Sequence, residues 1–146
     1  MNNDLERKLF NDFPLLYGGH KLSIRENLMS FGFEHDSGWY DIIYQLSLKL
    51  EPMIRRWIEE NEDEDLKDDY PMAVQVKEKF GGLSFYMTFA TVEMAKLISE
   101  AESESYKTCE SCGSKENVFQ TSGWITTTCN PCETKRQEKR KKLLDK

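Results

Sequence analysis

The sequence lacks several features on which whole protein classes depend. It contains only two histidines, His20 and His35. It contains only four cysteines, and all four cysteines lie within residues 109–132. Nothing at the N-terminus resembles a signal peptide, and no apolar run approaches the roughly 20 residues of a membrane-spanning helix. Gly81-Gly82 is not followed by the Gly-Lys-Ser/Thr ending of a phosphate loop. These absences argue against a small secreted disulfide scaffold, a membrane protein and a P-loop enzyme.

The composition is that of a folded protein with a heavily charged surface. Apolar residues make up 38% of the 146 residues and charged residues 32%, enough for one compact domain with an added small module. The cysteines have metal-binding spacing and no signal peptide precedes them. We therefore expect a soluble protein of a reducing cytoplasm.

The net charge of −6 is distributed unevenly along the chain. Residues 59–70 hold eight acids and one base, and residues 133–146 hold seven bases and three acids. An acidic body repels nucleic acid, whereas a basic tail attracts phosphates locally. Charge runs of this kind are also typical of ordinary solvated faces, so both interpretations stay open.

The four cysteines form two Cys-x-x-Cys pairs, Cys109 with Cys112 and Cys129 with Cys132. Each pair places two thiolates on one tight turn. The 16 residues between the pairs fall in the range of structural zinc sites with four cysteines. Gly113 follows the first pair, where a positive φ turns backbone N–H groups toward the sulfurs. We therefore predict a structural Zn²⁺ ion bound by all four cysteines, in a closed site with no open coordination position for a substrate.

Three other uses of the cysteines are chemically possible. Two disulfides suit a secreted scaffold, and a redox dithiol needs only one Cys-x-x-Cys pair, which leaves the other unexplained. An iron–sulfur cluster also takes four cysteines, but nothing in the spacing favours it. Zinc is the interpretation that we prefer, because it accounts for both pairs.

Apolar spacing predicts an α+β fold, with helices packed on a β-hairpin or small antiparallel sheet and a zinc-ribbon-like module at the C-terminal end. Helices are expected at residues 4–13, 39–60, 91–105 and 131–144, with a short one possible at residues 23–30. Pro52 should kink or restart the second helix. Thr91 can cap the third, whose apolar stripe includes Val92 and Ala95.

Two hairpins are predicted between these helices. Residues 73–80 and 83–89 alternate apolar and polar side chains around Gly81-Gly82, which suits a two-residue turn. Residues 118–120 can pair with residues 124–127 between the cysteine pairs. The chain is thus expected to divide into an α+β body at residues 1–105, a four-cysteine ribbon at 106–133 and a basic helix or tail at 134–146.

A few side chains have expected positions that the structure can test. Trp39 and Trp124 are expected to anchor cores, because buried tryptophans more often do this than stack on ligands. Residues 31–38 read as a loop. His35-Asp36 in this loop could act as an acid–base group or join a second metal site, but a lone loop histidine is more often a surface residue.

One face of the first hairpin is a candidate ligand surface. Lys77 and Lys79 lie two residues apart on one strand, and Ser84 and Tyr86 face the same side on the other. Positive charge beside an aromatic ring is typical of surfaces that bind phosphates or nucleotides. An ordinary solvated strand face has the same pattern, so this assignment also stays open.

Four stretches of the chain share a pattern with a known family. They are residues 13–17 (Phe-Pro-Leu-Leu-Tyr), residues 32–41 with Gly-Phe-Glu and Gly-Trp-Tyr-Asp, residues 76–86 (Val-Lys-Glu-Lys-Phe-Gly-Gly-Leu-Ser-Phe-Tyr) and residues 123–127 (Gly-Trp-Ile-Thr-Thr). Together they resemble a family of small, functionally uncharacterised phage and bacterial proteins with a C-terminal four-cysteine zinc ribbon. The resemblance covers most of residues 13–132. It implies a bacterial or phage-infected host cytoplasm and supplies no reaction. The family usually has arginine and cysteine at the positions of Ser84 and His35.

Three functions are consistent with these features, and we name no catalytic residue because no nucleophile, base and substrate site stand out together. The leading hypothesis is a small zinc-binding interaction protein that binds a protein partner and no membrane. The second is a nucleic-acid-binding protein that uses the ribbon and the tail bases Lys135, Arg136, Lys139, Arg140, Lys141 and Lys142. The third is a nucleotide-ligand binder or enzyme centred on Lys77, Lys79 and Tyr86.

Overall fold

The structure, a computed structural model, describes residues 1–62 and 70–145 and has the α+β fold expected from the sequence. Most of the acidic run at residues 59–70 therefore lies outside the described residues. The elements are α1 (Asn3–Asp12), β1 (Phe33–Glu34), α2 (Tyr40–Glu60), β2 (Ala73–Lys79), β3 (Gly82–Met87), α3 (Val92–Ser105), β4 (Val118–Gln120), β5 (Thr127–Cys129) and α4 (Asn130–Leu144), with short 3₁₀ helices at Gly18–Lys21, Leu28–Phe31 and Ser37–Trp39.

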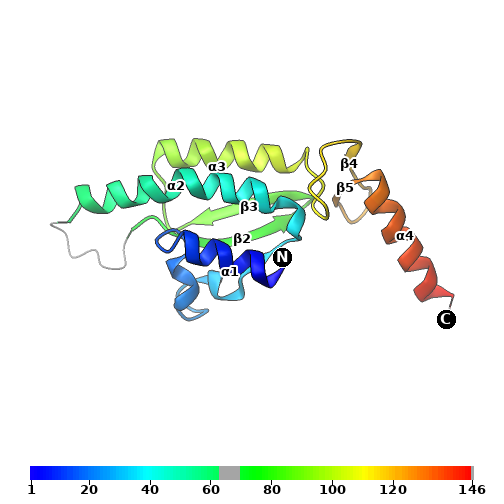
Figure 1. Ribbon diagram of the computed structural model, residues 1–146, viewed down its shortest axis with the longest axis horizontal. Coiled ribbons are helices and arrows are strands. Elements are labelled where there is room, and N and C mark those ends of the chain that lie inside the picture. Colours follow the sequence, from blue (N-terminus) through cyan, green and yellow to red (C-terminus); the bar gives the residue numbers. More distant parts are fainter. Residues whose placement is uncertain (63–69, 146) are drawn as a thin grey trace.

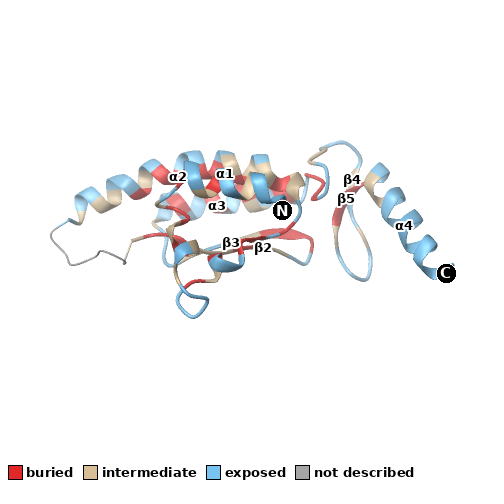
Figure 2. Cartoon of the chain, turned by 60° about the horizontal axis from the view of Figure 1, so that its bottom comes forward, coloured by how far each residue is buried: buried red, intermediate tan, exposed pale blue. Residues whose placement is uncertain are grey.

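Helices and sheet form two layers (Figure 1). α2 and α3 run side by side along the β2–β3 hairpin, and α1 packs against α2. β4, β5 and α4 lie together at one end of this body, and α4 projects away from it. Buried residues concentrate where the helices meet the sheet, whereas α4 has no buried residue and is exposed beyond its first turn (Figure 2).

The first sheet has the strand order β1-β2-β3. β2 and β3 form the predicted antiparallel hairpin, but Lys79 pairs with Gly82, so the turn residues are Phe80 and Gly81. Both have positive φ, 52° and 85°, which is what a two-residue hairpin turn of type I′ requires. The prediction of a Gly81-Gly82 turn was wrong by one residue, because Phe80 adopts a left-handed conformation that is uncommon for a bulky side chain.

The N-terminal third differs from the sequence prediction in two places. β1 lies in the segment predicted to be a loop and pairs in parallel with β2, which brings Glu34 beside Lys77. A strand of two residues is too short to show the alternation from which strands are recognised. The helix proposed for residues 23–30 is instead a turn followed by the 3₁₀ helix Leu28–Phe31.

The core lies between the sheet and the helices. Val76, Leu83 and Phe85 are buried on the sheet side. α2 and α3 contribute Ile43, Leu46, Leu50, Ile54, Met94, Ile98 and Ala101. Thr91 caps α3 as predicted, since its Oγ1 accepts from the backbone N–H of Met94 at 3.3 Å. The predicted stripe of this helix is correct at Ile98 and Ala101, which are buried. It was wrong at its start, because Val92 is 89% exposed and the buried positions begin at Met94.

α2 continues through Pro52 as one helix, so the expected restart does not occur. The missing N–H of Pro52 removes a bond to the carbonyl of Leu48, and Leu48 is an exposed position where water can replace it. Glu51 beside the proline is buried. Its carboxylate accepts from the N–H groups of Leu15 and Leu16 at 2.9 and 2.8 Å, which fastens the segment after α1 to α2.

Side chains of α3 cover the outer edge of β3. The N–H of Leu83 donates to Ser105 Oγ at 2.9 Å, and the N–H of Phe85 donates to Glu102 Oε2 at 3.1 Å. These bonds satisfy strand donors that would otherwise face solvent. They also hold the end of α3, and with it the start of the cysteine-rich region, against the hairpin.

Candidate metal centre and the adjoining basic cleft

The four cysteine sulfurs come together in one cluster, as the spacing of the two pairs predicts. All four Sγ atoms lie within 4.8 Å of one another, and those of Cys112 and Cys129 are 3.7 Å apart. Four thiolates around one ion at about 2.3 Å in a tetrahedron would be about 3.8 Å apart. The donor set therefore fits a four-coordinate metal ion.

Local backbone structure brings each cysteine pair into position. Gly113 has a φ of 83°, and its N–H donates to the carbonyl of Cys109 at 2.9 Å, which closes the first turn. The N–H of Cys109 donates to the carbonyl of Ser114 at 2.8 Å. In the second pair, Cys129 ends β5 and Cys132 lies in the first turn of α4. The second cysteine pair is therefore positioned by the end of a strand and the start of a helix, and not by a separate loop.

The thiols of this cluster do not ionise alike. Burial by itself raises the pKa of Cys109, but backbone N–H groups of Cys112, Cys129 and Ser111 outweigh it, and the pKa falls to about 6. Burial, and then the neighbouring cysteine sulfurs, raise the pKa of Cys132. The Cys109 thiolate therefore forms readily, whereas ionisation of Cys132 beside the other sulfurs is disfavoured. A divalent cation is what allows several thiolates to exist together in so small a space.

The ribbon hairpin has a different register from the one predicted. β4 pairs with β5 over Val118–Gln120 and Thr127–Cys129, so residues 124–126 are not in the sheet. Thr121 and Thr126 close the connecting loop, because the N–H of Thr121 donates to the carbonyl of Thr126 at 3.0 Å. Trp124 is 86% exposed in this loop, and its prediction as a core anchor was wrong.

Trp39, in contrast, is the core anchor that was predicted, and it joins the body to residues 108–114, the candidate metal-binding loop that carries Cys109 and Cys112. Its indole is fully buried, and Nε1 donates to the carbonyl of Thr108 at 2.9 Å. The N–H of Gly38 donates to the carbonyl of Glu110 at 2.7 Å. A Cβ on Gly38 would lie 2.2 Å from the carbonyl oxygen of Cys109, so the two backbones touch. The metal-binding loop therefore packs directly on the start of α2.

The hairpin turn provides a second contact with the ribbon. Thr127 Oγ1 donates to the carbonyl of Gly81 at 2.5 Å. A Cβ on Gly81 would lie 2.7 Å from Ile125, and one on Gly82 would lie 2.3 Å from the ring of Tyr106. Close approach to the ribbon explains the glycine doublet at least as well as the turn itself does. The sequence shows the doublet, but not what approaches it.

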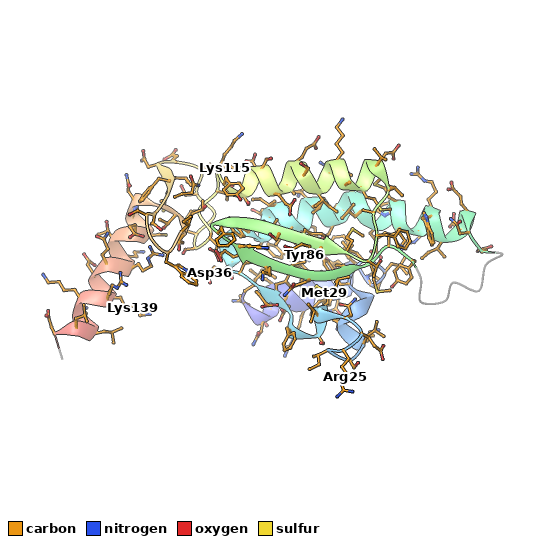
Figure 3. The ribbon with its side chains drawn as sticks, turned by 180° about the vertical axis from the view of Figure 1, so that it is seen from behind. Arg25, Met29, Asp36, Tyr86, Lys115 and Lys139 are labelled. Carbon is orange, nitrogen blue, oxygen red and sulfur yellow. The ribbon has the colours of Figure 1, made fainter. Side chains whose placement is uncertain are left out.

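Asp36 lies at the end of the sheet beside the ribbon (Figure 3), and its backbone binds both His35 and Glu110. The prediction of a surface histidine was wrong, because His35 is 6% exposed, and burial lowers its pKa to about 4. Its Nδ1 lies 2.7 Å from the carbonyl of Asp36. Burial raises the pKa of Glu110 to about 7, although its carboxylate accepts from the N–H of Asp36 at 3.0 Å.

An open cleft of about 700 Å³ lies between the ribbon loop and α4. It is lined on one side by Thr121, Ser122, Gly123 and Trp124, and on the other by Glu133, Arg136, Gln137, Lys139, Arg140 and Leu143. Arg136 is held by an ion pair with Glu133 at 2.7 Å. Three of the predicted tail bases, Arg136, Lys139 and Arg140, thus line the wall opposite Trp124, whereas Lys135 is not among the residues that line the cleft.

The predicted ligand face on the first hairpin is an open strand surface. Lys77 pairs in register with Ser84, and Gln75 pairs with Tyr86, which is 41% exposed. Lys79 Nζ lies 6.0 Å from the centroid of the Phe80 ring. A role of Lys77, Lys79 and Tyr86 in ligand binding stays a prediction.

Comparisons of the chain with protein-family models, curated proteins and solved structures find no match. The resemblance to phage and bacterial proteins, and the cytoplasmic setting that it implies, therefore stay predictions. Across residues 1–62 and 70–145, none of the helices combines the length and apolar character needed to cross a membrane.

Proposed function

We propose that this protein binds nucleic acid through the cleft between its ribbon loop and α4, and that a structural Zn²⁺ ion holds the ribbon in place. One observation carries the proposal. Arg136, Lys139 and Arg140 line one wall of an open cleft of about 700 Å³, opposite the exposed side chain of Trp124.

Zinc is the ion that best suits the four cysteines. It takes four thiolate ligands in a tetrahedron without redox chemistry, and such closed sites stabilise small modules rather than bind substrates. The ribbon is short, and its buried residues include no large apolar side chain: they are Thr108, Cys109, Glu110, Thr127, Thr128 and Cys129. Metal binding would supply the stability that so small a core lacks.

The charge of α4 suits a polyanion. The helix holds six bases and two acids, and none of its residues is buried. Neither Lys139 nor Arg140 makes an ion pair with another residue in the described part of the chain. Their spacing with Arg136 puts the three cations along one side of the helix, as contact with successive phosphates requires.

A protein partner was the first hypothesis from the sequence, and the cleft favours nucleic acid over it. The wall formed by α4 is charged rather than apolar, whereas the centres of protein interfaces are depleted in lysine. The rest of the chain is acidic, so attraction of a polyanion is confined to this end of the molecule. An acidic protein remains an outcome that the experiment distinguishes.

The test compares two triple variants that remove the same charge from α4. The cleft triple, Arg136→Ala/Lys139→Ala/Arg140→Ala, removes the three cations that line the cleft. The control triple, Lys135→Ala/Lys141→Ala/Lys142→Ala, removes three bases that do not line it. Fluorescence anisotropy would measure binding of labelled single-stranded and duplex oligonucleotides over a range of salt concentrations. We expect the cleft triple to lose at least about tenfold in affinity. Its log–log salt slope should fall by about 2 for a single strand.

The control triple should lose less, because its bases act only at a distance. Equal losses in the two triples would mean that the cleft has no role. Absence of binding by the wild-type protein at low salt, or binding of polyglutamate alone, would reject nucleic acid as the partner.

A further inference from the structure

The side chain of Trp124 sets this cleft apart from an ordinary basic surface. It is 86% exposed, whereas Trp39 is fully buried and Trp57 is half-buried with its ring 5.3 Å from that of Phe89. An indole offers a large flat apolar face on which a nucleotide base can stack. Trp124 lies in the cleft opposite the cations of α4, so a base on its ring would have its phosphates near those cations.

The loop that carries Trp124 is held in one shape by its own hydrogen bonds. Thr121 Oγ1 accepts from the N–H of Thr126 at 2.9 Å and donates to the carbonyl of Trp124 at 2.9 Å. Gly123 has a φ of 75° with nothing within 4 Å of an added Cβ, so its glycine serves the conformation of the loop. Less conformational entropy is lost on binding when the stacking residue is already in position.

The other wall and the size of the cleft match a short piece of single strand. A volume of about 700 Å³ lies within the range of about 300–1,000 Å³ typical of sites for ligands of nucleotide size. Arg136 is oriented by Glu133, and Lys139 and Arg140 lie beside it. Channels for single strands combine aromatic stacking with a cationic backbone track in this way.

We propose that the cleft recognises unpaired nucleotides, with one base stacked on Trp124 and its phosphates held by Arg136, Lys139 and Arg140. This inference rests on the proposed function and narrows it from nucleic acid in general to single strands. In a duplex both faces of each base are covered by neighbouring pairs, so a tryptophan at the surface has no base face to contact. Stacking tolerates every base, so we expect little sequence preference.

The experiment uses the full-length zinc-loaded protein and three 12-nucleotide probes: oligo-dT, a duplex of the same length, and a single strand with abasic sites throughout. Trp124→Ala removes the stacking face and Trp124→Phe keeps an aromatic ring. Phe80→Ala is the control, because Phe80 is a 73% exposed aromatic residue that does not line the cleft. Circular dichroism and zinc content would verify that each variant is folded.

We expect Trp124→Ala to weaken binding of oligo-dT by about 5- to 150-fold, the range of a single base–aromatic stack. Binding of the duplex and of the abasic strand should change by less than about twofold. Trp124→Phe should recover most of the lost affinity, and Phe80→Ala should bind as the wild type does. An equal loss on the abasic strand, or an unchanged affinity for oligo-dT, would overturn the inference.

The two proposals fail in different ways. If the cleft triple variant loses binding of all probes while Trp124→Ala loses none, nucleic-acid binding stands and base stacking does not. If the wild-type protein binds no probe at low salt, both proposals fail. Preference for the duplex over the single strand would also overturn the inference while leaving the proposed function intact.

Discussion

Gly38→Ala is the substitution that tests most directly whether the metal-binding loop and the body are coupled. Gly38 does not have a positive φ, so alanine meets no backbone strain there. Its Cβ would lie 2.2 Å from the carbonyl oxygen of Cys109 and 2.4 Å from that of Glu110. Both are backbone atoms of the loop that carries two of the candidate metal ligands, so neither can rotate away as the end of a side chain could.

The expected magnitude follows from these contacts. Overpacking a close contact costs about 1–3 kcal/mol. Moving the loop away would also strain the hydrogen bond from Gly38 N–H to the carbonyl of Glu110, which contributes about 1 kcal/mol. We expect a loss of about 3 kcal/mol in the metal-bound protein, or about 6–12 °C in melting temperature. Without a metal ion the loop can move away from the added Cβ, so the loss of unfolding free energy in the metal-free protein should be under about 1 kcal/mol.

The difference between these two losses must reappear as weaker metal binding, since folding and binding are linked. Zinc affinity, measured by competition with a chromophoric chelator, should fall by up to about 100-fold in Gly38→Ala. Gly123→Ala is the matched control. Its Cβ meets nothing within 4 Å, so it should lose about 1–2 kcal/mol from its positive φ alone, and its zinc affinity should not change. A zinc affinity for Gly38→Ala equal to that of the wild type would refute the coupling.

Two further predictions concern the cysteines and the buried histidine. Chelation of the metal should lower the melting temperature by about 8–16 °C, and Cys109→Ser should do the same with loss of bound zinc; a variant that keeps both its zinc and its stability would contradict a structural role. In an NMR titration, the ring signals of His35 should not shift between pH 5.5 and 8, because its pKa is lowered to about 4. Since an unfolded histidine binds its proton near pH 6.5 and the native one does not, His35 should remove stability as the pH falls from about 6.5 to 4, and a titration midpoint near 6.5 would show that the imidazole is solvated.

Patterns within a short stretch of chain predicted most of the secondary structure and the clustering of the four cysteine sulfurs. The steps of three and four in α2, the threonine that caps α3 and the Cys-x-x-Cys turns each depend on residues within one or two turns. The same holds for Gly113, whose positive φ is needed by the loop in which it lies. For features like these, the sequence contains the whole cause.

The errors fall where contacts between distant residues decide the outcome. In the ribbon, β5 begins at Thr127, whose hydroxyl binds the carbonyl of Gly81, far away in the sequence, whereas Trp124 lies outside the strand. β1 exists only because β2 lies beside it. His35 is buried by packing against the rings of Phe33 and Trp39. None of these partners can be chosen from local spacing.

The sequence by itself thus determined the α+β class, the hairpin and the ligand set of the candidate metal centre. Helical periodicity, strand alternation and tight-turn chemistry act over a few residues, so they can be read along the chain. Only the tertiary structure decided that Gly38, Gly81 and Gly82 are contact points between body and ribbon. It also decided that Trp124 lies exposed across a cleft from Arg136 and Arg140. A surface of this kind is made by elements that meet in space, and their meeting depends on the packing of the whole fold.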